Sequence, residues 1–175
     1  NWNDYHNSPF FFRLGNENDM MGVVSRHMLY EDNIYKMWFT TLTSQWTGRI
    51  FYATSTDGIQ WQRVSNEPVL NVSQNSWDSR SVGNGPVIKI NGAYRIYYGG
   101  RTSDSGHNHI GMAVSQDGLT WEKFPTPIIY AEPGWEFQIG ASDIIKINGI
   151  YHLYYYGYSN NSYKIGLATS IDGVV

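Results

Sequence analysis

A chain of 175 residues, 41% of them hydrophobic, is long enough to form one domain with a buried core. The net charge is −3, only 15% of the residues are charged and no basic run occurs, which argues against nucleic acid as a partner. No apolar run approaches the roughly 18 residues of a membrane-spanning helix, and cysteine is absent, so we expect a soluble domain without disulfides, metal or cofactor.

The N-terminal residues 1–12 match the start of a repeated unit that begins again at Trp61. Trp2 is followed by Pro9 after seven residues, just as Trp61 is followed by Pro68. Because the two segments share this spacing, we expect both to form the same strand of the unit. Residues 1–12 would then be an outer closing strand without the three strands that precede it in the other units.

Three units follow one another in one domain, 1–175, at about 1–60, 61–120 and 121–175. Each contains an apolar run, an aromatic run, a third strand-like run and an Asp-Gly pair. The Asp-Gly pairs are Asp57-Gly58, Asp117-Gly118 and Asp172-Gly173. Such a pair between strand-like runs indicates a β-hairpin, because glycine adopts a positive φ without steric cost. Aromatic residues make up 16% of the chain, which also favours strands. The fold class predicted is all-β, a β-propeller of four-stranded antiparallel blades.

The third unit stops at Val175, where its fourth strand should begin, and residues 1–12 are a fourth strand alone. Propellers generally have four to eight blades, so three blades are too few to close a ring. We therefore expect a two-fold homodimer forming one six-bladed ring, with residues 1–12 of each chain beside residues 164–170 of the other. The alternative is a fragment of a larger propeller, which a chain beginning at Asn1 without methionine also fits.

The second unit reads W-D-x-x-x-V-G-x-x-P-V-I-K-x-N-G-x-Y-x-I-Y-Y-G from Trp77 to Gly99, and I-G-M-A-V-S-x-D-G-L-T-W-E-K from Ile110 to Lys123. This pattern resembles the blades of the five-bladed propeller glycosidases, the arabinanase, β-xylosidase and fructosidase superfamily. The resemblance implies cleavage of glycosidic bonds by two carboxylates, one protonating the leaving oxygen and the other attacking the sugar or activating water.

The resemblance also implies that the acids lie at the central funnel, where the innermost strands begin. Asn84 stands at that position in the second unit and Arg26 in the first, so two of the three positions lack a carboxylate. Asparagine cannot deliver a proton at neutral pH. In the third unit an acid, Asp143, comes one position late, and its counterparts are His27 and Pro86. We therefore expect hydrolysis to be weak or lost, with Asp143 as the first candidate for a catalytic acid.

A second set of acids recurs between the units, at Asp19, Asp78 and Glu136. Each lies in a connection between blades that crosses one face of the ring, so these acids are also candidate catalytic residues. The alternative is that each accepts hydrogen bonds within a turn. Polar side chains expected near the funnel are candidates for binding sugar hydroxyls: Arg26, His27, Asn84, Ser142 and Arg80.

The sequence favours a glycoside hydrolase-like, carbohydrate-active propeller that binds an oligo- or polysaccharide. If it is an enzyme, we expect a glycoside hydrolase with carboxylate acid–base chemistry. The alternatives are a non-catalytic, lectin-like propeller and a protein-interaction ring. His107 and His109 lie two residues apart, but a third ligand is not evident in the sequence, so no metal site is predicted.

Overall fold

The computed structural model describes residues 22–83 and 85–174, so the predictions for residues 1–12, Asp19 and Asn84 lie outside the described residues. Within these ranges the chain forms twelve β-strands and no helix. The predicted all-β class is confirmed. No helix that could cross a membrane occurs in the described ranges.

The strands form three antiparallel sheets that follow one another along the chain. The first sheet has the order β1 (Gly22–Glu31), β2 (Ile34–Leu42), β3 (Gly48–Ser55) and β4 (Gln62–Arg63). In the second sheet, β5 (Ser81–Gly83) and β6 (Val87–Ile90) both pair with β7 (Ala93–Arg101), which is followed by β8 (His109–Ser115) and β9 (Glu122–Lys123). The third sheet consists of β10 (Gln138–Ile147), β11 (Ile150–Ser159) and β12 (Ser162–Ser170).

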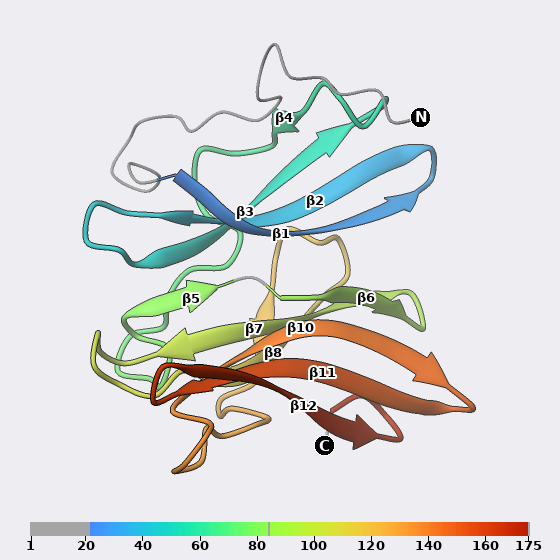
Figure 1. Ribbon diagram of the computed structural model, residues 1–175. Helices are drawn as coiled ribbons and strands as arrows, with labels where there is room; N and C mark the ends of the chain where they lie inside the picture. Colours follow the sequence, from blue (N-terminus) through green and yellow to red (C-terminus); the bar gives the residue numbers. More distant parts are fainter. Residues whose placement is uncertain (1–21, 84, 175) are drawn as a thin grey trace, which may run out of the picture.

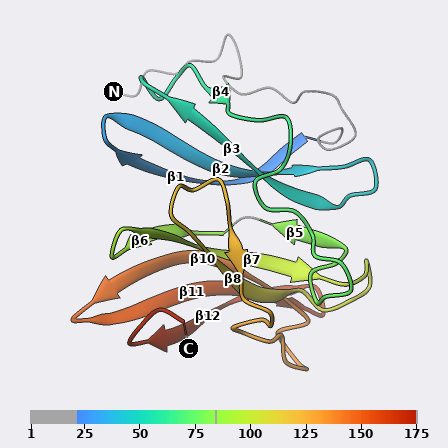
Figure 2. The same ribbon diagram turned by 180° about the vertical axis from the view of Figure 1, so that it is seen from behind.

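The second sheet lies between the other two, and the sheets are stacked in chain order (Figures 1 and 2). Contacts join β1 to β6, β3 to β5, and β10 to both β7 and β8. Gly85, just before β6, also lies next to Ala141 of β10. The beginnings of the three sheets are therefore close to one another.

The Asp-Gly pairs form the same turn in all three units. In the first, the Asp57 carboxylate accepts hydrogen bonds from the backbone N–H groups of Ile59 at 2.8 Å and Gln60 at 2.7 Å, and Gly58 has a φ of +74°. These bonds lower the pKa of Asp57 below its usual value. The turn occupies residues 56–61, which is longer than a two-residue hairpin, because the aspartate side chain bridges its backbone. The predicted turn role of these aspartates is confirmed.

An aromatic side chain in the second strand of one sheet donates a hydrogen bond to the turn glycine of the next sheet. Trp38 Nε1 donates to the Gly118 carbonyl oxygen at 2.8 Å, and Tyr97 Oη donates to that of Gly173 at 2.6 Å. Both aromatic side chains are buried. A Cβ at position 118 would lie 2.7 Å from the Trp38 ring. The same contact thus connects the first sheet to the second and the second to the third.

Apolar side chains fill the two spaces between the sheets. One cluster contains Trp38, Ile50 and Tyr52 of the first sheet and Tyr94 and Ile96 of the second. The other joins the far face of the second sheet, including Tyr97, Ile110 and Met112, to Ile144, Leu153 and Tyr155 of the third. Burial of these large side chains is the main favourable term that holds the sheets together.

The face of the third sheet that points away from the second sheet is exposed. Tyr154 has the same register as Trp38 and Tyr97, since it lies opposite Leu167 just as they lie opposite Tyr52 and Met112. We call this surface the open face; it comprises Tyr154, Tyr163, Ile165 and Leu167. Its exposed fractions range from 36% at Tyr154 to 81% at Ile165. An apolar sheet face of this kind is typical of an interaction surface.

We expect Gly118→Ala to destabilise the protein more than Gly92→Ala. Both glycines have a positive φ, +77° and +86°, so either alanine costs about 1 kcal/mol in backbone strain. Nothing lies within 4 Å of a Cβ at position 92, whereas a Cβ at position 118 would clash with Trp38. The clash should add roughly 1–3 kcal/mol. Urea unfolding measures both values, and equal costs would contradict the contact between Trp38 and the turn.

Candidate functional site

A cleft of about 360 Å³ opens where the first strands of the three sheets come together. Its walls include Val24 of β1, Ser81 and Gly83 of β5, Arg101 of β7, Gln138 of β10 and Tyr156 of β11. All three sheets therefore contribute to one concave surface. Most ligand sites are concave surfaces that carry a few convergent polar groups.

The first strand of each sheet is irregular beside this cleft. The register of β1 shifts between Val23 and Ser25, and that of β10 shifts between Ala141 and Asp143. In the second sheet, β5 ends at Gly83 and β6 begins at Val87. Bulges bend a strand and redirect its side chains, and they are frequent next to active sites. Of the predicted funnel residues, Arg26 and His27 follow the irregular position of β1, Ser142 is the bulge residue of β10 and Asp143 follows it.

Gly85 allows a close approach between the second and third sheets. A Cβ at this position would lie 2.1 Å from the Tyr97 carbonyl oxygen and 3.1 Å from the Ala141 side chain. Only glycine fits there without a shift of the backbone. The glycine of the Asn-Gly-Pro sequence thus helps to bring the first strands together.

Two of the predicted site residues, from different sheets, lie within electrostatic range of each other, although neither lines the cleft, whose β10 wall ends at Ala141. His27 on β1 and the Asp143 carboxylate on β10 interact electrostatically. Burial lowers the pKa of His27, and this effect exceeds the opposing effects of Asp143 and of a hydrogen bond with the backbone of Val87. The Asp143 side chain is exposed and accepts a hydrogen bond from the backbone N–H of Ile144 at 2.8 Å. The structure therefore brings together groups from β1, β6 and β10.

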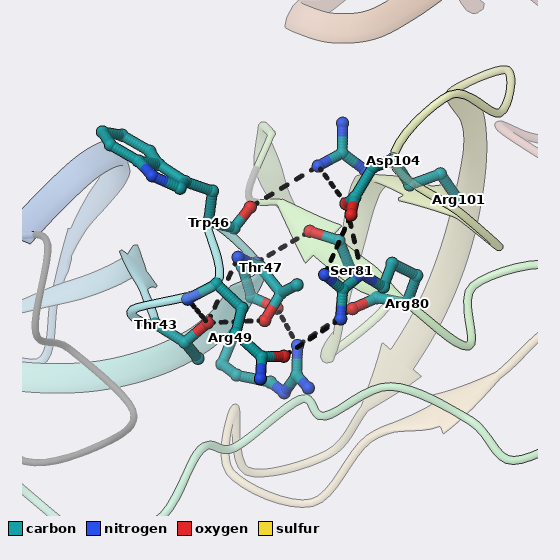
Figure 3. Close-up of polar contacts among 10 residues, drawn as sticks. Thr43, Trp46, Thr47, Arg49, Arg80, Ser81, Arg101 and Asp104 are labelled. Carbon is teal, nitrogen blue, oxygen red and sulfur yellow. Dashed lines mark hydrogen bonds and ion pairs between the residues drawn. The ribbon is translucent and has the colours of Figure 1, made fainter.

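The other predicted binding residues have different surroundings. Ser142 is the bulge residue of β10 and is exposed, as is Arg26 on β1. Arg80 pairs with Asp104, with its Nη2 at 3.0 Å from Oδ2 and its Nε at 3.1 Å from Oδ1 (Figure 3). Arg80 thus belongs to a network of loops next to the cleft. A role in substrate binding for these residues stays a prediction.

That network ties the β2–β3 loop of the first sheet to the second sheet (Figure 3). Arg80 Nη1 donates to Gln45 Oε1 at 3.2 Å, and Arg101 Nη2 donates to the Trp46 carbonyl oxygen at 3.5 Å. The backbone N–H of Gly48 donates to Ser81 Oγ at 2.7 Å. Hydrogen bonding to Arg80 lowers the pKa of Asp104. These contacts hold one wall of the cleft in place.

The recurring acids Asp78 and Glu136 lie elsewhere and are buried. Asp78 Oδ2 accepts a hydrogen bond from Tyr98 Oη at 3.1 Å and pairs with Lys123 Nζ at 2.5 Å. Glu136 Oε1 accepts one from Tyr155 Oη at 2.7 Å. Burial raises the pKa of Tyr155 to about 12, so this tyrosine stays a donor at neutral pH. Each acid therefore anchors a connection between blades to the second strand of its own sheet, and a catalytic role for either stays a prediction.

Sequence reasoning missed the polar residues that line the cleft, above all Arg101, Asn108 and Gln138. Arg101 brings a positive charge to the cleft, and its side chain is partly exposed there. One sequence signal could have identified it. Arg101 is a charged residue at the end of an aromatic strand, in the register position where the first unit has Leu42.

We expect Asp143→Asn to lower the pKa of His27 further. The negative charge of Asp143 raises the pKa of His27, whereas burial lowers it. Removal of this charge therefore lets burial lower the pKa of His27 further. Asp104→Asn is the control, since Asp104 pairs with Arg80 and Arg101 instead. NMR titration of the histidine resonances measures the shift. An unchanged His27 pKa in Asp143→Asn would show that the two side chains do not interact.

Comparisons with known proteins agree on carbohydrate-active relatives. No family model matches the chain. A 1,2-beta-oligomannan phosphorylase of Thermoanaerobacter sp. (strain X514) is 33% identical over 126 residues, which cover 64% of this chain and 42% of that protein. The chain spans less than half the length of the curated relatives it matches.

Solved structures show the same fold. A family 117 glycoside hydrolase from Zobellia galactanivorans superposes with a TM-score of 0.73 at 19% identity, covering 95% of this chain and 56% of that one. A structure from the GH130 family of mannoside phosphorylases, which contains glycoside hydrolases that target β-1,2-mannosidic linkages, has a TM-score of 0.70 at 18% identity, covering 85% and 49%. The expected resemblance is thus confirmed at the level of the fold, that of propeller glycoside hydrolases.

Proposed function

We propose that the protein is a carbohydrate-active propeller that binds an oligosaccharide in the cleft and uses Asp143 as its acid. The observation that carries this proposal is the cleft lined by residues of all three sheets, because its wall on β10 ends at Ala141, just before the bulge that leads to Asp143. The Asp143 charge also acts on His27 of the first sheet. Asp143 is the acid that breaks the repeat, and its exposed carboxylate can reach a ligand. His27, with a lowered pKa, is neutral at pH 7 and can donate or accept a hydrogen bond.

The acids of the described chain favour one reaction type over another. Hydrolysis of a glycosidic bond by the usual route needs two carboxylates flanking the scissile bond. Asp78 and Glu136 are buried against tyrosines, and Asp104 pairs with Arg80 and Arg101, which leaves Asp143 as the candidate acid of the described residues. In phosphorolysis the phosphate itself attacks the sugar, so a single acid suffices to protonate the leaving oxygen. Together with the phosphorylase relatives, this favours phosphate-dependent cleavage of β-1,2-mannosides, with weak hydrolysis.

Arg101 is well placed to bind a mannoside or phosphate in the cleft. Its partly exposed side chain lines the cleft, and the guanidinium charge can attract a phosphate group or bind a sugar hydroxyl. The non-catalytic alternative uses the same groups for binding alone. An open cleft of this size gives less support to the protein-interaction ring, for which a funnel filled by side chains is expected.

Asp143→Asn tests the proposed role of the acid. With β-1,2-mannotriose and inorganic phosphate, we expect the release of mannose 1-phosphate to fall by about 10²–10⁴-fold, because the proton donor is lost. The melting temperature should not change. The matched control is Asp32→Asn, which makes the same change in the β1–β2 hairpin, where φ is positive and asparagine is well tolerated.

Full activity in Asp143→Asn would contradict the role of this acid. Release of free mannose by the unmodified protein at an equal rate with and without phosphate would show hydrolysis instead. Oligosaccharide binding without turnover would favour the lectin-like alternative.

We also propose that a further sheet of the same kind covers the open face. Trp38 and Tyr97 each bond to the turn glycine of a following sheet, and Tyr154 occupies the same register without such a partner among the described residues. In the homodimer predicted from the sequence, the first sheet of a second copy covers this face. The outward face of that sheet, with Met37 and Phe39, is already buried within one chain. A further sheet supplied by a longer chain could cover the open face without first uncovering a face that is already buried.

We expect residues 1–175 to self-associate and Ile165→Lys to weaken this association, because a charge in the middle of the open face opposes its burial. Val64→Lys is the control, since Val64 is also exposed but lies after β4, away from the open face. Sedimentation velocity and binding of a hydrophobic dye provide the measurements. A mass of two chains that Ile165→Lys halves would support the homodimer. If the unmodified protein is a monomer and binds no more dye than the Ile165→Lys variant does, the open face needs no covering sheet.

A further inference from the structure

Trp46 has an unusual backbone conformation. Among the described residues, eight other than glycine have a positive φ, and seven of them are asparagine or aspartate. The eighth is Trp46, with a φ of +59°. Asparagine and aspartate tolerate this region, whereas a bulky side chain there is strained. Such strain persists where the surrounding contacts determine the conformation, and it is concentrated at functional sites.

The contacts around Trp46 hold this conformation. The backbone N–H of Trp46 donates to the Thr43 carbonyl oxygen, and that of Thr43 donates to the Thr47 carbonyl oxygen, both at 3.0 Å. The Thr43 and Thr47 hydroxyl groups lie 2.7 Å apart and share a hydrogen bond. Arg101 of the second sheet donates to the Trp46 carbonyl oxygen. The loop is thus fixed both from within and from the neighbouring sheet.

The loop lies at the rim of the cleft. Leu42 and Gly48, which flank it in the sequence, both line the cleft, and so does Arg101. The Trp46 side chain is 60% exposed, and its indole points away from the cluster of Arg80, Arg101 and Asp104 (Figure 3). A large aromatic side chain is therefore presented to solvent at the rim, outside the part of the cleft that carries the polar groups.

We propose that Trp46 is a stacking platform for a sugar ring at the rim of the cleft, an inference that rests on the proposed function. The flat apolar face of an indole packs against the C–H face of one pyranose, while polar groups of the cleft bind hydroxyls of the neighbouring sugar units. A carbohydrate fits this combination better than a protein partner does, because the adjoining wall carries Arg101, Asn108 and Gln138. Trp46 then forms an outer subsite for chains longer than the part held in the cleft.

Replacement of Trp46 should separate binding from stability. We expect Trp46→Ala to weaken the binding of β-1,2-mannotetraose by roughly tenfold, the loss typical of one stacked ring, and Trp46→Phe to lose less. Trp46→Asn should lose affinity as Trp46→Ala does, yet melt about 2–4 °C higher than the unmodified protein because the strain is relieved. Tyr163→Ala, a change at an exposed aromatic residue of the open face, should bind as the unmodified protein does.

Calorimetric titration with β-1,2-mannotetraose, β-1,4-xylotetraose and α-1,5-arabinotetraose measures the affinities, and thermal unfolding measures the stabilities. Equal affinity of Trp46→Ala and the unmodified protein would contradict the subsite while leaving the proposed function intact. A lower melting temperature in Trp46→Asn would contradict the strained conformation. Failure of the unmodified protein to bind any of the three sugars would contradict the proposed function itself.

Discussion

The structure depends on one repeated contact between sheets, in which an aromatic side chain meets the turn glycine of the following sheet. Trp38 makes this contact with Gly118 and Tyr97 makes it with Gly173. The glycine is needed both for its positive φ and for the space next to the aromatic ring. With the apolar clusters around it, the contact fixes how each sheet sits on the next. The convergence of the first strands, and hence the cleft, follows from that stacking.

Comparison of the three repeated units distinguishes residues that stabilise the fold from candidate site residues. Asp78 and Glu136 recur between units, and each is buried and accepts a hydrogen bond from a tyrosine. Asp143 occurs in one unit only, and its charge acts on His27 of the first sheet. Trp46 is unusual in another way, since the other described positions with positive φ carry asparagine, aspartate or glycine. In this protein, departures from the repeat identify the candidate site.

Much of the fold could be predicted from local sequence signals. The strand-like apolar and aromatic runs and the Asp-Gly pairs correctly indicated the all-β class and the turns, because both reflect the backbone preferences of short segments. The break between β5 and β6 was not predicted, since it depends on the close approach of Gly85 to Tyr97 and Ala141. The cleft residue Arg101 was missed for a similar reason. Its position depends on how two sheets pack, which spacing along one chain does not encode.

A crystal structure with a bound β-1,2-mannooligosaccharide tests the central claim most directly, namely that the converging first strands form the binding site. We expect electron density for the sugar in the cleft between β1, β5 and β10, within hydrogen-bonding distance of Asp143 or Arg101. A sugar bound to the open face of the third sheet or to the outer strands, with the cleft empty, would contradict it.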